Sequence, residues 1–466
     1  MKFQNRGAVV ARMLDTDELY TAVERVFSSP GEASTTDLSK ACRFCATDEQ
    51  SVQAFEGVQD LKGALLGLLN VSLEGRGDED TSEVDVRRAR LALRTLINAA
   101  NRSKKFAECV TTETLTLFRT LIRIPELRTE TFAALVALAR PMRIACGLSD
   151  NYTILFGELV LLWESQELND SHRSWISALV SVHLEEDFGF LASHFADLSC
   201  DEFSALLHIT GVLIESYHGE TVTKVHPNNI SFCVNLMERI LYEFGEGVSS
   251  DRRLPYVEQL SYAVDIIASA ALRDTEFSTQ LLDRPTAVEI IVDILEAVLD
   301  AQWMDENDGF SELTPPAHPD RPQREREVRC LRVSESPQLS ALSAAIRGSS
   351  VEVRATLKRE AVRAIGHLCY ERPALRVAAG SRGAVLAVLR CARLTDKDAP
   401  FIVQWSIATL RQLCLGCPEN QKFILEMDQG AEDAGDDRCR WGEEGEVENE
   451  ERRPKKSPGG AGRRLL

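Results

Sequence analysis

Apolar side chains recur at helical spacing along most of the chain and predict a succession of amphipathic helices. Leu61, Leu65, Leu68 and Leu69 give one example, because residues three and four positions apart share one face of a helix. Further segments with this pattern cover residues 16–29, 84–101, 113–122, 130–139, 151–164, 171–185, 201–216, 231–244, 256–272 and 288–303. Their connections are short and several contain proline, which favours helix ends. Sustained strand alternation is missing from the sequence, so we expect an all-α protein.

The helical pattern repeats in the C-terminal part of the chain. Ile365 and Leu368 are followed by Cys369, and Leu410 and Leu413 are followed by Cys414, so that matching positions lie 45 residues apart. Armadillo and HEAT repeats have a period of roughly 40–47 residues, and each repeat buries its apolar face against its neighbours. The sequence therefore predicts an armadillo/HEAT-like, right-handed helical solenoid, a fold that binds partners rather than performing chemistry.

Residues 357–427 also resemble the C-terminal domain of the ataxin-10 family. The similarity lies in the run Ala-Ile-Gly-His-Leu-Cys-Tyr at 364–370, in the proline-led helix at 400–413 with Trp405, and in Pro-Glu-Asn-Gln at 418–421. Two departures are Gln404, where the family usually has an acid, and a shorter, more basic connection at 372–383. The resemblance implies a cytoplasmic protein that interacts with other proteins and with itself, with roles in cell division (cytokinesis) and cell survival.

Changes in composition divide the chain into four predicted parts. Residues 1–303 are N-terminal armadillo-like helical repeats, residues 304–335 form a flexible loop rich in proline and charge, and residues 336–427 are the ataxin-10-like helical domain. Residues 428–466 are predicted to be a disordered tail, because such a polar segment cannot bury enough apolar surface to fold. The tail is acidic up to Glu451, and the stretch from Arg452 onwards contains six bases and no acid.

The overall charge and the cysteines narrow the range of functions. A net charge of −19 argues against a nucleic-acid partner, which needs a basic face. The sequence has no run of about 18 uncharged apolar residues, so we expect no membrane span. The 12 cysteines are scattered, and the start of the chain suits neither a signal nor a transit peptide. These features favour a reducing compartment, and we expect a cytoplasmic protein.

Motif searches point away from catalysis and cofactors. The chain lacks a phosphate loop, an HExxH helix, a nucleophile elbow and a dinucleotide-binding glycine turn. We therefore expect that the protein is not an enzyme and that it has no cofactor and no catalytic residue. Two Cys-x-x-Cys pairs, Cys42 with Cys45 and Cys414 with Cys417, have the spacing of zinc ligands. Because the pairs belong to distant units, we expect buried thiols and no metal site, and we read the acidic string 305–309 as a solvated loop.

Five residues are candidates for contact with a protein partner. Tyr370 and Trp405 are selected because aromatic anchors dominate many interfaces, although both also fit the core between repeats. Phe401, Ile402 and Phe423 lie where the last repeat presents an end, which natural arrays cap with polar residues. Exposed apolar groups there would favour self-association. Two alternatives remain open at this point: a metal-binding or transport-related factor, and a nuclear-transport carrier.

Overall fold

The computed structural model describes residues 36, 38–40, 42, 83–102, 112–146, 150–187, 189–215, 225–272, 284–308, 331–393 and 399–432. All regular elements in these ranges are helical. In the N-terminal half they are α6 (Glu83–Arg102), α8 (Thr112–Ile122), the 3-10 turn η3 (Pro125–Leu127), α9 (Arg128–Cys146), α10 (Asp150–Glu164), α11 (Asp170–Glu186), α12 (Phe190–Asp197) and α13 (Cys200–Glu215). The chain continues with α14 (Pro227–Glu246), α15 (Ser250–Ala271), α17 (Pro285–Asp308), α19 (Leu331–Glu335), α20 (Pro337–Arg347), α21 (Val351–Cys369), α22 (Pro373–Ser381), α23 (Ala384–Arg393), α24 (Ile402–Cys414) and α25 (Pro418–Glu432).

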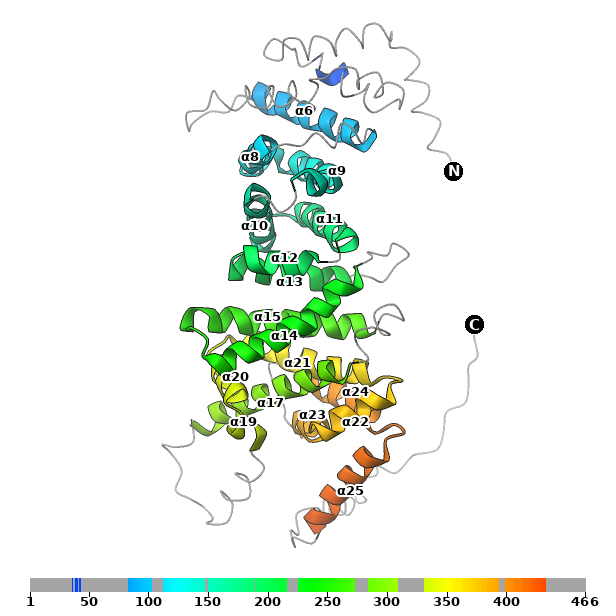
Figure 1. The fold of residues 1–466 in the computed structure, drawn as a ribbon. Coiled ribbons are helices and arrows are strands. Elements are labelled where there is room, and N and C mark those ends of the chain that lie inside the picture. The colour runs from blue at the N-terminus through cyan, green and yellow to red at the C-terminus, as the bar shows by residue number, and fades with distance from the viewer. Residues whose placement is uncertain are drawn as a thin grey trace, which may run out of the picture.

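The helices are stacked in an elongated array from α6 at one end to α25 at the other (Figure 1). Each helix of the stack contacts helices of the neighbouring layers: α9 lies between α6 and α11, and α13 lies between α10 and α15. The order then continues from α15 to α21 and from α21 to α24. This arrangement confirms the predicted all-α, armadillo-like solenoid. No helix in the described ranges is both long enough and apolar enough to cross a membrane.

A continuous apolar core runs through the stack and includes side chains from nearly every helix. Phe118, Phe156 and Phe203 are at most 1% exposed in the N-terminal layers, and Ile365 and Leu413 are fully buried in the C-terminal ones. Ile365 and Leu368, the positions that revealed the repeat, lie on α21, and α21 packs directly against α24. The 45-residue period therefore reflects the packing of successive layers.

Helix α17 joins the two predicted halves of the protein. It contacts α20, α21, α22 and α23, while α15 contacts α21, so the helices on either side of residues 304–335 share one core. The predicted loop is helical at both ends, because α17 continues to Asp308 and α19 covers Leu331–Glu335. The rest of that prediction, residues 309–330, lies outside the described residues. Most of the predicted tail does too, although α25 extends to Glu432.

Side-chain caps and prolines explain where many helices begin. Asn169 accepts a hydrogen bond from His172 N (2.9 Å) at the start of α11, and Ser350 accepts one from Val353 N (3.2 Å) at the start of α21. Such caps satisfy backbone N–H groups that the first helical turn leaves free. Pro255 is an exception to the expectation that prolines mark helix ends. It lies inside α15 rather than ending a helix, and α15 begins at Ser250.

Candidate functional site

Exposed apolar side chains gather in the last helices of the stack. Phe401 is 65% exposed, Ile407 60%, Leu415 54% and Leu425 62%. Phe401 immediately precedes α24, the other three belong to α24, α25 or their connection, and the two helices pack against each other. Large apolar side chains usually stay buried, so several of them on two adjoining helices mark a surface that is suited to a partner.

Two of the predicted interaction residues lie on or next to this surface. Phe401 is the residue that precedes α24, and Phe423, which is 40% exposed, projects from α25. Tyr370 is also accessible, with 54% exposure, because it follows the last turn of α21, where the chain turns through Glu371 (φ 55°) towards α22. These three side chains are available for contact.

The other two predicted residues are less accessible. Ile402 is 1% exposed and belongs to the apolar core, so its selection as an interaction residue is wrong. It begins α24 and points inward, while its neighbour Phe401 stays outside. Trp405 is partly buried: its ring lies 6.0 Å from the His367 ring, edge to face, and the Arg363 guanidinium carbon is 5.9 Å from its centroid. Trp405 therefore connects α24 to α21.

Helix α25 is held mainly by polar contacts. Asn420, which is 4% exposed, donates from Nδ2 to the carbonyl oxygens of Leu413 (2.8 Å) and Arg376 (3.1 Å). Gly380 makes room for this amide, because a Cβ atom there would lie 1.8 Å from Asn420 Oδ1. Between residues 418 and 426 only Asn420 is buried and Ile424 half-buried, so α25 offers most of its surface to solvent.

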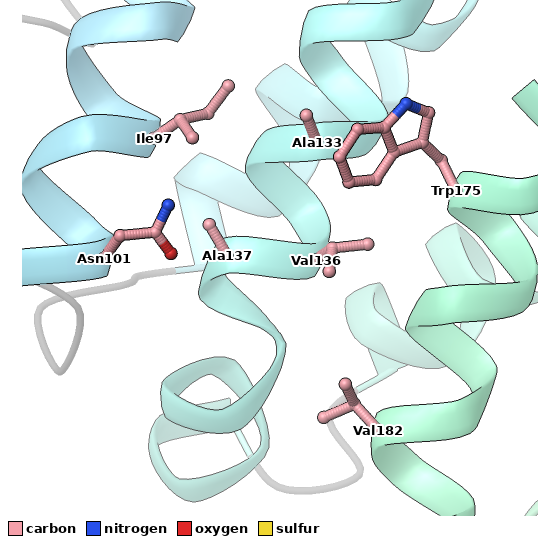
Figure 2. Close-up of a pocket in the computed structure, with 7 residues that line it drawn as sticks. All are labelled: Ile97, Asn101, Ala133, Val136, Ala137, Trp175 and Val182. Atoms are coloured by element: carbon pink, nitrogen blue, oxygen red, sulfur yellow. The ribbon is translucent and has the colours of Figure 1, made fainter. Parts of the chain in front are cut away.

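A hollow lies near the other end of the stack, between α6, α9 and α11 (Figure 2). It has a volume of about 290 Å³. Small side chains on the middle helix, Ala133 and Ala137, leave a gap between Ile97 on α6 and Trp175 on α11. Asn101 is the polar residue of this lining. The hollow is mostly apolar, and no sequence pattern predicts it because its residues come from three separate helices.

The cysteines of the two Cys-x-x-Cys pairs differ in how deeply they are buried. Cys414 is half-buried and Cys417 buried, with Cys417 Sγ 3.5 Å from Glu419 Oε2. Burial raises the pKa of the Cys414 thiol, and the nearby Cys417 adds to this rise. Cys42 is half-buried at the far end of the chain, and Cys45 lies outside the described residues. Among the side chains that the structure describes, no group of three or more His, Cys, Asp or Glu residues is arranged to hold a metal ion.

Two other polar residues have partners in distant segments. Asp305 lies in α17 rather than in the expected solvated loop, and its carboxylate pairs with Arg347 (2.7 Å) and with Arg354. His183, in the last turn of α11, is 1% exposed, with Nε2 hydrogen-bonded to Tyr152 Oη and its ring stacked 5.1 Å from Phe190. Both residues pair with distant segments, which the local sequence does not reveal.

A comparison with protein families gives a match in the C-terminal region. Residues 357–444 match the family model of the spinocerebellar ataxia type 10 protein domain. No curated protein matches the chain. Among solved structures, a crystal structure of an engineered protein is 15% identical over 85% of this chain and 98% of its own, with a TM-score of 0.33.

A second solved structure is similar to a comparable extent. It comes from work on a conserved phosphorylation switch that controls the interaction between cadherin and beta-catenin, and it is 15% identical over 84% of this chain and 78% of its own, with a TM-score of 0.34. TM-scores this low do not define a shared fold. The assignment of the fold therefore rests on the stacked helices themselves.

The fold and the apolar C-terminal surface define an all-helical solenoid of the kind that displays side chains to partners. The family match adds a specific assignment. Residues 357–444 are similar to the ataxin-10 family domain, which confirms the resemblance found in the sequence over residues 357–427.

Proposed function

We propose that this chain is a non-catalytic scaffold that binds other proteins, and a second copy of itself, through the exposed apolar side chains of α24 and α25. We refer to these side chains, Phe401, Ile407, Leu415, Phe423 and Leu425, as the end surface. The observation that carries the proposal is their exposure on the last two helices of the described array. Repeat arrays need polar capping faces to remain soluble as monomers.

Physical chemistry favours a macromolecular partner for this surface. A stable protein interface buries about 800 Å² on each partner and has an apolar core with aromatic and aliphatic anchors. The end surface supplies such anchors from two packed helices. Small-molecule sites are instead concave and enclosed, whereas α25 is largely open to solvent.

The finer parts of the proposal come from the resemblance to the ataxin-10 family. They are a cytoplasmic location and roles in cell division and cell survival. Two other classes compete with the scaffold. A metal-binding or transport-related factor would contain bound metal, which elemental analysis of the purified chain detects. A nuclear-transport carrier would enrich basic nuclear proteins, rather than copies of itself, in a pull-down.

Self-association is tested by measuring the mass of the full chain as a function of concentration, by analytical ultracentrifugation. The variant Phe401→Ser/Leu425→Ser removes the two most exposed members of the end surface, at 65% and 62%. The matched control Tyr242→Ser/Leu272→Ser removes two apolar side chains of similar exposure, 61% and 63%, from α14 and the end of α15. We expect the first variant to weaken association at least about tenfold and the control to leave it unchanged.

Two results would contradict this proposal. One is a wild-type chain that stays monomeric at all accessible concentrations. The other is equal weakening by both double variants, because that would place the contact outside the end surface. Circular dichroism of each variant checks that the helices are intact.

A further inference from the structure

A row of aromatic rings crosses three successive helices in the middle of the stack. The ring of Trp163 on α10 lies 5.1 Å from His208 on α13, edge to face, and the His208 ring stacks 4.8 Å from Tyr262 on α15 with an angle of 12° between planes. All three side chains are half-buried. We call this row and the residues beside it the ladder face.

Acidic side chains border the rings on the same three helices. Glu164 Oε1 accepts a hydrogen bond from His208 Nδ1 (2.7 Å), which fixes its carboxylate beside the row. Burial raises the pKa of the Glu258 carboxyl, and the negative charges of Asp201 and Glu164 add to this rise. Burial also raises the pKa of Tyr262 to about 12, again with contributions from Glu164 and Glu258. Acids from α10, α13 and α15 therefore act on one another across the rings.

Farther along α15, arginines of α21 pair with the acids. Arg363 lies 2.7 Å from Glu360 Oε2 and 3.8 Å from Asp265 Oδ1, and Arg359 Nε lies 2.7 Å from Glu360 Oε1. By contrast, the charges that act on Glu258 come from acids. The ladder face therefore combines negative charge with half-buried aromatic rings.

Such a surface fits a flexible segment that is rich in lysine and arginine. Basic side chains pair with carboxylates, and they also lie favourably over aromatic rings. The chain itself contains a segment of this chemistry: residues 452–466 carry Arg452, Arg453, Lys455, Lys456, Arg463 and Arg464 and no acid. We propose that this basic segment docks on the ladder face of its own molecule. This inference goes beyond the proposed function and does not depend on self-association.

The length of the connection sets how far the basic segment can reach. Helix α25 ends at Glu432, so residues 433–451 separate it from the basic segment. A fully extended chain spans about 3.3 Å per residue, which gives a reach of about 60 Å. The acids of residues 433–451 are repelled by the ladder face, whereas the basic segment beyond them is attracted. Attachment to the same chain raises the effective concentration of the segment at any site within this reach.

Tryptic cleavage after Lys455 and Lys456 in the full chain tests the proposal. A docked segment is cleaved only while it is released, so the cleavage rate follows the released population. The variant Glu164→Gln/Glu258→Gln removes two charges from the ladder face and leaves the cleaved sequence unchanged. We expect cleavage to become about threefold to tenfold faster, because each exposed ion pair contributes modestly.

A matched control removes two exposed acids elsewhere, by Glu126→Gln in η3 and Glu238→Gln in α14. It should cleave at the wild-type rate. Equal rates for the two double variants would overturn the proposal. Protection that disappears on dilution would overturn it as well, since the segment of a second copy would then occupy the face.

Carbodiimide cross-linking provides a second measurement on the wild-type chain. This reagent joins amines directly to carboxylates that touch them. In the monomeric fraction we expect links from Lys455 or Lys456 to Glu164, Asp201 or Glu258. Links confined to the acids of residues 433–451 would show that the basic segment pairs with its own neighbours, and the proposal would fail.

Discussion

Replacing Asn420 with alanine should release α25 from the end of the stack. The Asn420 amide is buried, and its Nδ2 group donates to Arg376 O (3.1 Å) and Leu413 O (2.8 Å). Alanine removes both hydrogen bonds and leaves two carbonyl oxygens without this donor. The rest of α25 offers little compensation, because Ile424 is its other packed side chain between residues 418 and 426.

The size of the effect follows from these two bonds. A buried hydrogen bond contributes about 0.5–1.5 kcal/mol net, and an unsatisfied buried group costs about 1–3 kcal/mol. We therefore expect α25 to open about 2–4 kcal/mol more easily, which is at least about thirtyfold in its opening equilibrium. The loss should be local, since helices at the end of an array open without the core.

Hydrogen exchange measured by mass spectrometry on peptides of α25 checks this prediction. Exchange within residues 418–432 should accelerate in Asn420→Ala, while exchange in α21 should stay unchanged. Gln421→Ala is the control, because Gln421 is exposed and donates a single bond to Cys414 O (2.7 Å). If both variants exchanged alike, the buried amide would not be the anchor of α25, and the reasoning would be refuted.

Two further predictions concern the packing and titration of α21 and α15. Gly366→Ala places a Cβ 2.6 Å from Thr409 Oγ1, which is held by its hydrogen bond to Val362 O (2.9 Å). Urea unfolding should therefore show that the free energy of unfolding falls by about 1–3 kcal/mol. The control Gly348→Ala, whose new Cβ would be 3.5 Å from its nearest neighbour, should cost less, and equal losses would contradict the packing argument. Burial, with Glu360 nearby, raises the pKa of Asp265 to about 6, above about 3.9 in the unfolded chain, so its stabilising contribution is present at low pH and is lost as pH rises through 6. Urea unfolding at pH 5 and pH 7 should therefore show the stability of Asp265→Asn rising relative to wild type by on the order of 1–2 kcal/mol, and a pH-independent difference would rule this out.

The periodic positions made the fold predictable from the sequence. Leu368 and Leu413 lie one repeat apart, and both are fully buried where α21 packs on α24; of the other matching pair, Ile365 is fully buried and Leu410 half-buried. A helix shows its buried face in the spacing of its own residues, so the number and type of elements can be predicted locally. Pro255 misled the prediction, because it is the sixth residue of α15 and the helix continues through it, although a proline is normally tolerated only in the first turn.

The candidate site was only partly predictable. Phe401 and Ile402 are both apolar neighbours at the start of α24, yet one is 65% exposed and the other 1%. Which of them faces the core depends on how α24 lies against α21, and no local pattern contains that information. The ladder face was missed for the same reason, since Trp163, His208 and Tyr262 are brought together only by the stacking of α10, α13 and α15.

The shared core around α17 changes how fragments of this protein should be interpreted. Helix α17 precedes residues 309–330, and its contacts include α20 to α23, which follow them. A fragment that ends near Glu335 would expose the surface of α17 that packs on α20 to α23. It would also expose the surface of α15 that packs on α21. Such a fragment would lose partners by misfolding, so deletion mapping cannot separate the two halves. Point substitutions on intact surfaces are the appropriate way to assign binding to either end.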